Sequence, residues 1–277
     1  MRKTKLPSGE SIPVLGQGTW YMGDEPRRRA EEIATLRLGL DLGMSLIDTA
    51  EMYGDGASEK LVGEAIAGRR EEIFLVSKVL PSNASRNGTI AACERSLKRL
   101  GTDRIDLYLL HWRGRTPFAE TIAAFEALQD AGKIRHWGVS NMDVDDMSEI
   151  ARASGGDAMA TNQVLYNLTR RGIEYDLLPQ AHGRGLPLMA YSPIEQGRLT
   201  EYPEVEDIAD KYGVTPAQIA LAWVLRQQGV IAIPKASTLS HVQDNRAALD
   251  VKLTEEDLAE LDEVFPPPSG PESLEMI

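Results

Sequence analysis

The sequence has almost no cysteine and no long apolar run. Its 277 residues include one cysteine, Cys93, so no intrachain disulfide can form. No signal-peptide pattern opens the chain, and no apolar run approaches the roughly 18 residues of a membrane-spanning helix. We therefore expect a soluble protein of the reducing cytoplasm, with Cys93 packed inside an amphipathic helix over residues 89–100.

An excess of positive charge is also absent. Thirty Lys and Arg residues stand against 42 Asp and Glu, which gives a formal net charge of −12. Proteins that bind the phosphate backbone need the opposite balance or a strong basic stripe. The run Arg27-Arg28-Arg29 is too short for such a stripe and is typical of a solvated helix start. The composition argues against nucleic acid and against anionic membranes as partners.

Histidine is scarce, which limits the kinds of catalytic site. The four histidines are His111, His136, His182 and His241, and none belongs to a His-x-His or His-Glu-x-x-His pattern. The sequence therefore predicts no catalytic metal. A Gly-x-Ser-x-Gly elbow is missing too, which argues against an α/β-hydrolase.

What the chain does contain is a regular alternation of short apolar runs with helical patterns. The runs are VLGQGTW, MSLIDTA, EIFLVSK, RIDLYLLH, IRHWGVSN, AMATNQV, PLMAYSP and VIAIPK. Eight strand–helix units predict an α/β (β/α)₈ TIM barrel formed as one domain over residues 1–277. A hairpin with its turn at 7–10 precedes the barrel, and extra helices are expected at 203–211 and 254–264. A doubly wound sheet is the alternative, but no Gly-x-Gly-x-x-Gly opens a first helix.

The helix boundaries carry their own signals. Gly43, Gly101 and Gly132 follow helical stretches, where glycine accepts the left-handed conformation that ends a helix. Thr215 and Pro216 have the pattern of an N-cap followed by proline in the first helical turn.

Polar residues stand where the predicted strands end. In barrels of this kind the active site lies at the C-terminal ends of the strands, so these side chains should meet at one mouth. The set comprises Gly18, Asp48, Lys78, His111, Ser140, Asn141, Gln163, Tyr191 and Lys235.

Four of these positions suggest a specific chemistry. Taken alone, each has a structural explanation: a surface lysine, a capping aspartate, a half-buried tyrosine or a core histidine. Together, Lys78 and Asp48 can form an ion pair, and Tyr53 follows Asp48 by five residues. A nearby ammonium should lower the pKa of a tyrosine from about 10 toward the working range. His111 could then donate a hydrogen bond to a substrate oxygen.

The ordered segments LIDTAEMYG, FLVSK, DLYLLHW, WGVSN, TNQVLYN, MAYSP and IPKAS resemble those of the aldo-keto reductases. The resemblance runs from the hairpin to about residue 265. Within the family, GQGTWYMG and RGIEYDLLP are similar to bacterial reductases of methylglyoxal and other small aldehydes. The resemblance implies hydride transfer from a nicotinamide cofactor, NADPH above all, to a carbonyl group.

The resemblance also implies residue roles. Tyr53 would be the general acid, Lys78 would lower its pKa, Asp48 would hold Lys78, and His111 would orient the carbonyl. Ser140, Asn141 and Gln163 would hold the carboxamide, Tyr191 would stack on the ring, and residues 192–199 would wrap the diphosphate. The cofactor set is Gly18, Thr19, Trp20, Asp48, Ser140, Asn141, Gln163, Tyr191, Ser192, Pro193, Ile194, Gln196, Gly197, Leu199, Ile233, Pro234, Lys235, Ala236, Ser237, His241, Asp244 and Asn245. The substrate set is Trp20, Tyr21, Tyr53, His111 and Trp112.

One departure from the family pattern concerns the choice of cofactor. Lys235 could meet a 2′-phosphate, but six residues later many NADPH-dependent members carry arginine and this chain has His241. A neutral histidine recognises phosphate less well than a guanidinium does. The sequence therefore favours NADPH as the cofactor and leaves NADH as an alternative.

Two further expectations concern partners and substrates. We expect a monomer that acts on a small carbonyl compound, with an open mouth because the chain after the last helix is short. A non-enzymatic binding or regulatory subunit is the competing function, since one fold can serve both.

Overall fold

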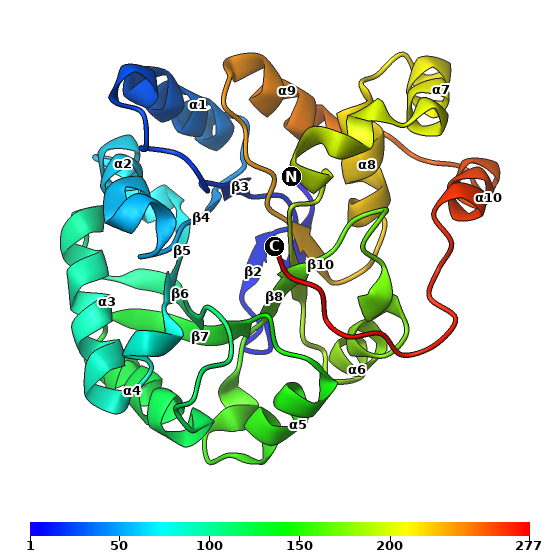
Figure 1. Ribbon diagram of the computed structural model, residues 1–277. Helices are drawn as coiled ribbons and strands as arrows, with labels where there is room; N and C mark the ends of the chain where they lie inside the picture. The colour runs from blue at the N-terminus through cyan, green and yellow to red at the C-terminus, as the bar shows by residue number, and fades with distance from the viewer.

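Eight parallel strands form one sheet in the order β10-β9-β8-β7-β6-β5-β4-β3, and helices surround it (Figure 1). The computed structural model describes all residues 1–277. The strands are β1 (Lys3–Lys5), β2 (Ser11–Pro13), β3 (Gln17–Gly18), β4 (Leu46–Asp48), β5 (Phe74–Val79), β6 (Ile105–Leu110), β7 (Ile134–Ser140), β8 (Asn162–Leu165), β9 (Leu188–Tyr191) and β10 (Val230–Ala232). The strands β1 and β2 pair separately as the predicted antiparallel hairpin.

Ten α-helices and eight 3₁₀ turns connect these strands. The α-helices are α1 (Arg29–Asp41), α2 (Ala57–Ile66), α3 (Arg86–Leu100), α4 (Phe118–Asp130), α5 (Val144–Arg152), α6 (Leu177–Gly183), α7 (Pro203–Tyr212), α8 (Pro216–Leu225), α9 (Leu239–Ala247) and α10 (Glu255–Val264). The 3₁₀ turns are η1 (Pro26–Arg28), η2 (Tyr53–Gly56), η3 (Arg70–Glu72), η4 (Pro81–Asn83), η5 (Gly156–Ala158), η6 (Gly172–Glu174), η7 (Glu195–Glu201) and η8 (Ala248–Asp250). The two extra helices expected near the C-terminus are α7 and α10. None of the helices is both long and apolar enough to cross a membrane.

The first and last strands of the sheet meet and close the barrel. Bridges join Leu15 to Ala232 and Gly18 to Lys235, and the Gly18 N–H donates to the Pro234 carbonyl at 3.0 Å. A Cβ added to Gly18 would lie 2.7 Å from the carbonyl oxygen of Ile233, so this close approach requires glycine. The predicted (β/α)₈ barrel is therefore confirmed, and the doubly wound alternative is excluded.

The helix ends follow the signals in the sequence. Thr215 and Gln218 form a capping box in which each side chain bonds the other's backbone, and Pro216 occupies the first helical position. Gly101 ends α3 in the left-handed conformation, at φ 64°.

The alternation of side chains along the strands determines which of them point into the barrel and reach its mouth. Along a strand, successive side chains point to opposite faces. Leu46, Val76, Leu107 and Leu109 belong to the inner apolar cluster, with Leu6 and Ile12 of the N-terminal segment. Continuing this period of two along β4, β5 and β6 turns Asp48, Lys78 and His111 inward as well.

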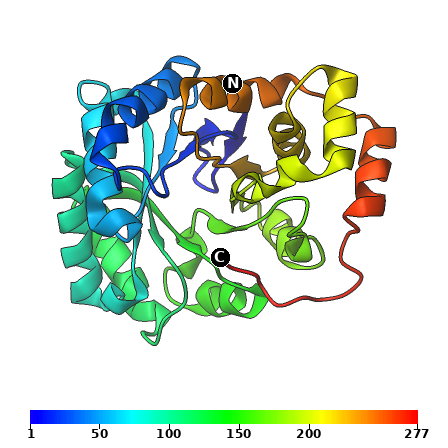
Figure 2. The ribbon, with the colours of Figure 1, turned by 45° about the horizontal axis from the view of Figure 1, so that its top comes forward.

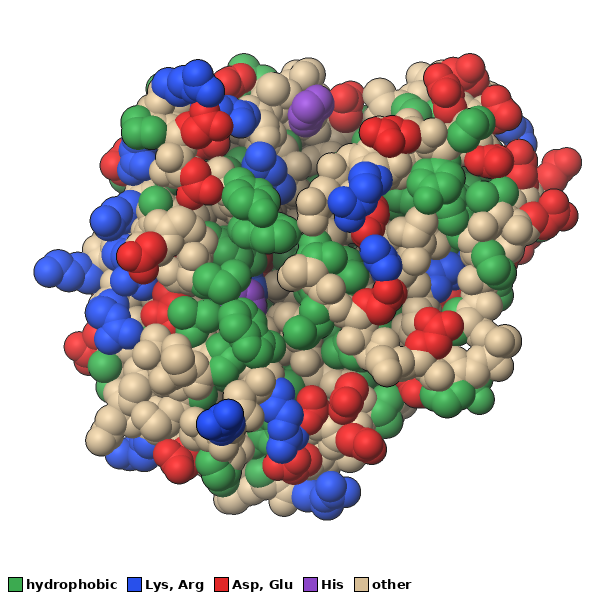
Figure 3. Space-filling view, in the orientation of Figure 1, with side chains coloured by type: hydrophobic (Ala, Val, Ile, Leu, Met, Phe, Trp, Pro, Cys, Tyr) green, Lys and Arg blue, Asp and Glu red, His purple; other side chains and the backbone are tan.

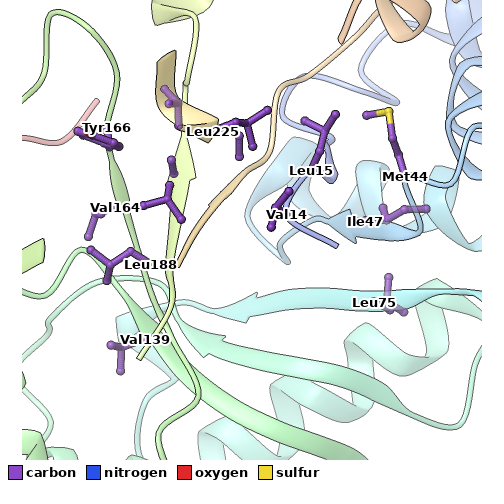
Figure 4. Packing of buried hydrophobic residues seen from close by; sticks show 14 of the residues in the cluster. Val14, Leu15, Met44, Ile47, Leu75, Val139, Val164, Tyr166, Leu188 and Leu225 are labelled. Carbon is purple, nitrogen blue, oxygen red and sulfur yellow. The ribbon is translucent and has the colours of Figure 1, made fainter. Parts of the chain in front are cut away.

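A second apolar layer lies between strands and helices. Figure 4 shows Val14, Leu15, Met44, Ile47 and Leu75 in this layer, which contains 60 buried residues. Cys93 is buried there on α3, as expected, and burial raises the pKa of its thiol to about 12. A buried thiol that stays protonated packs as a small apolar group.

The segment after α10 returns to the centre of the barrel mouth (Figures 1 and 2). Its last residues, Met276 and Ile277, line the cavity at that mouth. These two residues add to the cavity walls, and an open mouth, expected from the shortness of this segment, stays a prediction.

Candidate active site

A cavity of about 690 Å³ opens at the C-terminal ends of the strands. Figure 3 shows it as a hollow with hydrophobic side chains gathered along its walls. Its walls contain Gly18, Thr19, Trp20, Tyr21, Asp48, Met52, Tyr53, His111, Trp112, Ser140, Asn141, Gln163, Tyr191, Ser192, Pro193, Ile194, Gln196, Gly197, Ile233, Lys235, Ser237, His241, Met276 and Ile277. The structure thus brings together most of the residues that the sequence singled out.

Lys78 is the centre of a buried polar group beneath this cavity. Its side chain is fully buried, and its Nζ donates to Asp48 Oδ2 at 2.8 Å, to the Thr49 carbonyl at 2.9 Å and to Tyr53 Oη at 3.1 Å. Three acceptors satisfy the three donors of an ammonium group. The predicted ion pair between Lys78 and Asp48 is present, with the tyrosine hydroxyl as its third partner.

The two titratable neighbours affect each other's pKa. Burial opposes the charge of Lys78, but Asp48 and Tyr53 together raise its pKa above the ordinary value. Burial also raises the pKa of Tyr53; Lys78 opposes this rise and Asp48 adds to it. The expectation of a lowered tyrosine pKa is therefore wrong in direction, because the cost of burying a phenolate outweighs the attraction of one ammonium. Tyr53 remains a phenol at neutral pH.

His111 is a neutral imidazole at the mouth. Burial, with the charge of Lys78, lowers its pKa to about 2. Its Nδ1 is buried without a hydrogen-bond partner, and its ring meets that of Tyr53 edge-on with centroids 5.9 Å apart. A neutral imidazole can donate one hydrogen bond to a group in the cavity without carrying charge.

Buried hydroxyl groups fix the loop that carries Tyr53. Ser58 Oγ lies 2.8 Å from Thr19 Oγ1 and 3.1 Å from Thr49 Oγ1, and Thr19 Oγ1 donates to the Asp48 carbonyl at 2.9 Å. The Glu51 carboxylate accepts from the Leu80 N–H at 2.8 Å. The sequence reasoning missed the roles of Glu51, in the segment after β4, and of Ser58, in the first turn of α2.

A second polar chain crosses the mouth from β7 to β9. Tyr191 Oη donates to Asn141 Oδ1 at 2.9 Å, and Asn141 Nδ2 donates to the His111 carbonyl at 3.1 Å. Ser140 Oγ donates to the Gln163 carbonyl at 2.9 Å, and Gln163 Nε2 donates to Asp48 Oδ1 at 2.8 Å. The predicted residues of both halves of the barrel therefore belong to one connected network.

Comparison with known proteins agrees with this arrangement. The model of the Aldo/keto reductase family matches residues 14–265. The chain belongs to the aldo-keto reductase family.

Its relatives are similar over nearly their whole length. The chain is 54% identical over 272 residues to Methylglyoxal reductase YeaE of Escherichia coli K12, covering 96% of each protein. It is 35% identical to the Glyoxal reductase of Bacillus subtilis, covering 93% of this chain and 91% of the relative. An aldo/keto reductase from Klebsiella pneumoniae, solved in complex with NADP and acetate, superposes with a TM-score of 0.97 at 49% identity over 99% of both chains.

In this aldo-keto reductase the segment after β9 forms one wall of the cavity. Ser192, Glu195, Gln196 and Gly197 all have positive φ values, which give this wall an irregular backbone. The buried Glu195 carboxylate fixes it by accepting from Asn167 at 2.7 Å and pairing with Arg170 at 3.1 Å. Sequence reasoning did not single out Glu195, whose partners lie about one barrel unit earlier in the chain.

Some predicted residues do not line the cavity. Lys78 lies behind Tyr53, and Leu199, Pro234, Ala236, Asp244 and Asn245 lie outside the cavity walls. Conversely, Met52, Met276 and Ile277 line it without having been predicted. Their apolar type is common throughout the core, so no local signal in the sequence distinguishes them.

Proposed function

We propose that this chain is an NADP(H)-dependent reductase of small aldehydes and ketones, with Tyr53 as the general acid. The observation that carries the proposal is the Tyr53 side chain, which lines the cavity while its hydroxyl accepts from the buried Lys78 ammonium that pairs with Asp48. The identity to a methylglyoxal reductase supports a small aldehyde of that kind as substrate. The monomeric state and the cytoplasmic location stay predictions.

The residues present fit a nicotinamide dinucleotide. The cavity volume lies within the range of about 300–1,000 Å³ that is usual for ligand pockets. Ser140, Asn141 and Gln163 would hold the carboxamide, Tyr191 would stack on the ring, and the wall from Ser192 to Gly197 would face the diphosphate. Lys235 supports an anionic group at the far end, since its ammonium has no carboxylate within 4 Å.

The protein's own groups supply the remaining parts of the reaction. The cofactor, when bound, supplies the hydride. Tyr53 donates its hydroxyl proton to the carbonyl oxygen as negative charge develops there, and its raised pKa keeps that proton available at neutral pH. His111, neutral at every working pH, donates a hydrogen bond that orients the same oxygen. Lys78 keeps a positive charge next to the tyrosine oxygen after the proton has left.

The wall opposite the cofactor residues is aromatic and apolar. The rings of Trp20 and Tyr21 stack with centroids 4.5 Å apart, and Trp112 packs against His111 at 4.8 Å. Met52 and Met276 add flexible apolar side chains. These walls suit a small uncharged carbonyl compound better than an anionic one.

The test compares two tyrosines of the same cavity. Tyr53→Phe removes the proposed acid, whereas Tyr21→Phe removes a hydroxyl that has no hydrogen-bond partner in the protein. We expect kcat for methylglyoxal and for an aromatic aldehyde to fall about 10²–10⁴-fold in Tyr53→Phe and to stay within about twofold in Tyr21→Phe. The loss of NADPH absorbance measures turnover, and NADPH binding should persist in both variants.

Two outcomes would count against the proposal. Turnover that survives in Tyr53→Phe would show that another group is the acid. A wild-type protein that binds NADPH but reduces no carbonyl in the panel would support a binding or regulatory subunit instead.

A further inference from the structure

The arginine run at the start of α1 contains one side chain without a partner. Arg27 pairs with Glu25 at 2.8 Å, and Arg29 pairs with Glu64 on α2 at 2.6 Å. Arg28, between them, is partly buried and makes no ion pair or side-chain hydrogen bond. A guanidinium without a partner in the protein keeps its hydrogen-bond donors free for an anion.

The position of Arg28 places it near the far end of the cavity. It precedes Glu32 by four residues and Leu36 by eight, and both are buried, so Arg28 lies on the inward face of α1. The helices α1 and α9 pack side by side (Figures 1 and 2). Both follow strands of the parallel barrel, so both begin at the mouth, where Lys235, Ser237 and His241 line the cavity.

Lys235 is the second cation at this end. Its Nζ donates to Ser237 Oγ at 2.5 Å and forms no ion pair. Burial lowers the pKa of Lys235, and the positive charge of Arg28 lowers it further. Figure 3 shows a histidine and basic side chains at this upper end of the hollow.

The nearby carboxylates do not neutralise this pair. Asp24 and Glu32 partly offset the lowering of the Lys235 pKa, but neither forms an ion pair with Arg28 or Lys235. The Glu32 carboxylate instead accepts from the Gly23 N–H at 2.9 Å. Arg28 and Lys235 therefore both lack a carboxylate partner, in a protein whose net charge is −12.

We propose that Arg28 and Lys235 together bind the 2′-phosphate of the cofactor, and that Arg28 supplies the guanidinium that selects NADPH over NADH. The inference rests on the proposed function. A guanidinium can pair with two phosphate oxygens at once, which a lysine or a neutral histidine cannot do. In this proposal Arg28, beside α1, takes the place of the arginine that many NADPH-dependent members carry at the position of His241 on α9, the helix that packs against α1.

Direct binding measurements test this role without relying on turnover. The dissociation constants of NADPH, NADH, 2′,5′-ADP and 5′-ADP are measured by calorimetry for wild type, Arg28→Ala and Arg27→Ala. We expect Arg28→Ala to weaken NADPH and 2′,5′-ADP about 10–100-fold and to change NADH and 5′-ADP less than about twofold. Arg27→Ala should change none of the four, and Arg28→Lys should recover part of the loss.

The alternative outcomes separate the two proposals. Equal weakening of NADPH and NADH in Arg28→Ala, or no weakening of either, would overturn the role of Arg28 and leave the proposed function intact. A wild type that binds 2′,5′-ADP no better than 5′-ADP would overturn the 2′-phosphate site as a whole. A wild type that binds neither dinucleotide would instead refute the proposed function.

Discussion

Each end of the barrel contains a buried carboxylate in an ion pair. The two ends differ in whether all the polar groups around that pair have partners within the protein. At the bottom, Asp106 on β6 is 1% exposed and accepts from Arg70 at 2.7 Å, from Arg135 at 3.0 Å and from the Leu75 N–H at 2.9 Å. Arg135 in turn pairs with Glu10, in the turn of the N-terminal hairpin, at 2.8 Å. Each charge there has an opposite neighbour.

At the mouth, Asp48 is 2% exposed and pairs with Lys78, but the network then ends at groups that face the cavity. One is the neutral Tyr53 hydroxyl, and another is His111, whose Nδ1 has no partner. A buried ion pair is therefore not in itself a sign of catalysis, since the bottom has a more complete one. What distinguishes the mouth is the set of polar groups left open to a ligand.

The largest effect that follows from this comparison concerns Lys78. Lys78→Met removes the charge beside the Tyr53 oxygen, and we expect kcat for aldehyde reduction to fall about 10²–10⁴-fold. Arg70→Met is the matched change at the bottom and should leave kcat within about twofold at 25 °C. Steady-state kinetics on variants whose circular dichroism matches wild type measures both. Equal losses of kcat in the two variants would mean that the network at the mouth is no more important for catalysis than the network at the bottom.

The second effect concerns stability and should appear at the bottom. Asp106→Asn leaves two arginines without their buried carboxylate, and we expect the free energy of unfolding to fall by about 3 kcal/mol. This value is at the low end for a broken buried ion pair because the Arg135 side chain is half exposed. The melting temperature should fall by roughly 6 °C while kcat at 25 °C stays unchanged. Asp103→Asn, at an exposed pair with Arg104, is the control and should change stability by less than about 0.5 kcal/mol. A melting temperature that does not move would show that the bottom network contributes nothing.

The strands and the polar groups at their ends could be predicted from the sequence alone, for a simple geometric reason. The period of two along β4 to β6 turns Asp48, Lys78 and the adjacent His111 to the same side, and parallel strands bring their ends to one mouth. These are local rules that act within a few residues. They also located the hairpin and the cap at Thr215.

The remaining features depend on distances that no local pattern contains. Glu195 bonds to Asn167, 28 residues earlier, and Glu51 bonds to Leu80, 29 residues later. The return of Met276 to the mouth depends on the path of the chain after α10. The pKa of Tyr53 rises because of burial, which only the folded structure determines. Within the run predicted to be solvated, Arg27 and Arg29 have partners, whereas Arg28 is partly buried and has none.

The smallest effect concerns the pH dependence of aldehyde reduction, which distinguishes the neutral groups of the mouth from ordinary tyrosine and histidine. Tyr53 has a pKa above its usual value of about 10, and that of His111 is about 2, so neither group changes charge between about pH 6 and pH 9. Below its raised pKa the tyrosine keeps the proton that reduction needs, so kcat/KM for aldehyde reduction should vary less than about twofold over this range. Oxidation of the corresponding alcohol needs the phenolate and should accelerate about tenfold per pH unit over the same range. A change in kcat/KM near pH 6.5 that disappears in His111→Gln would contradict this prediction. It would mean that His111 becomes charged in this range and that burial does not lower its pKa.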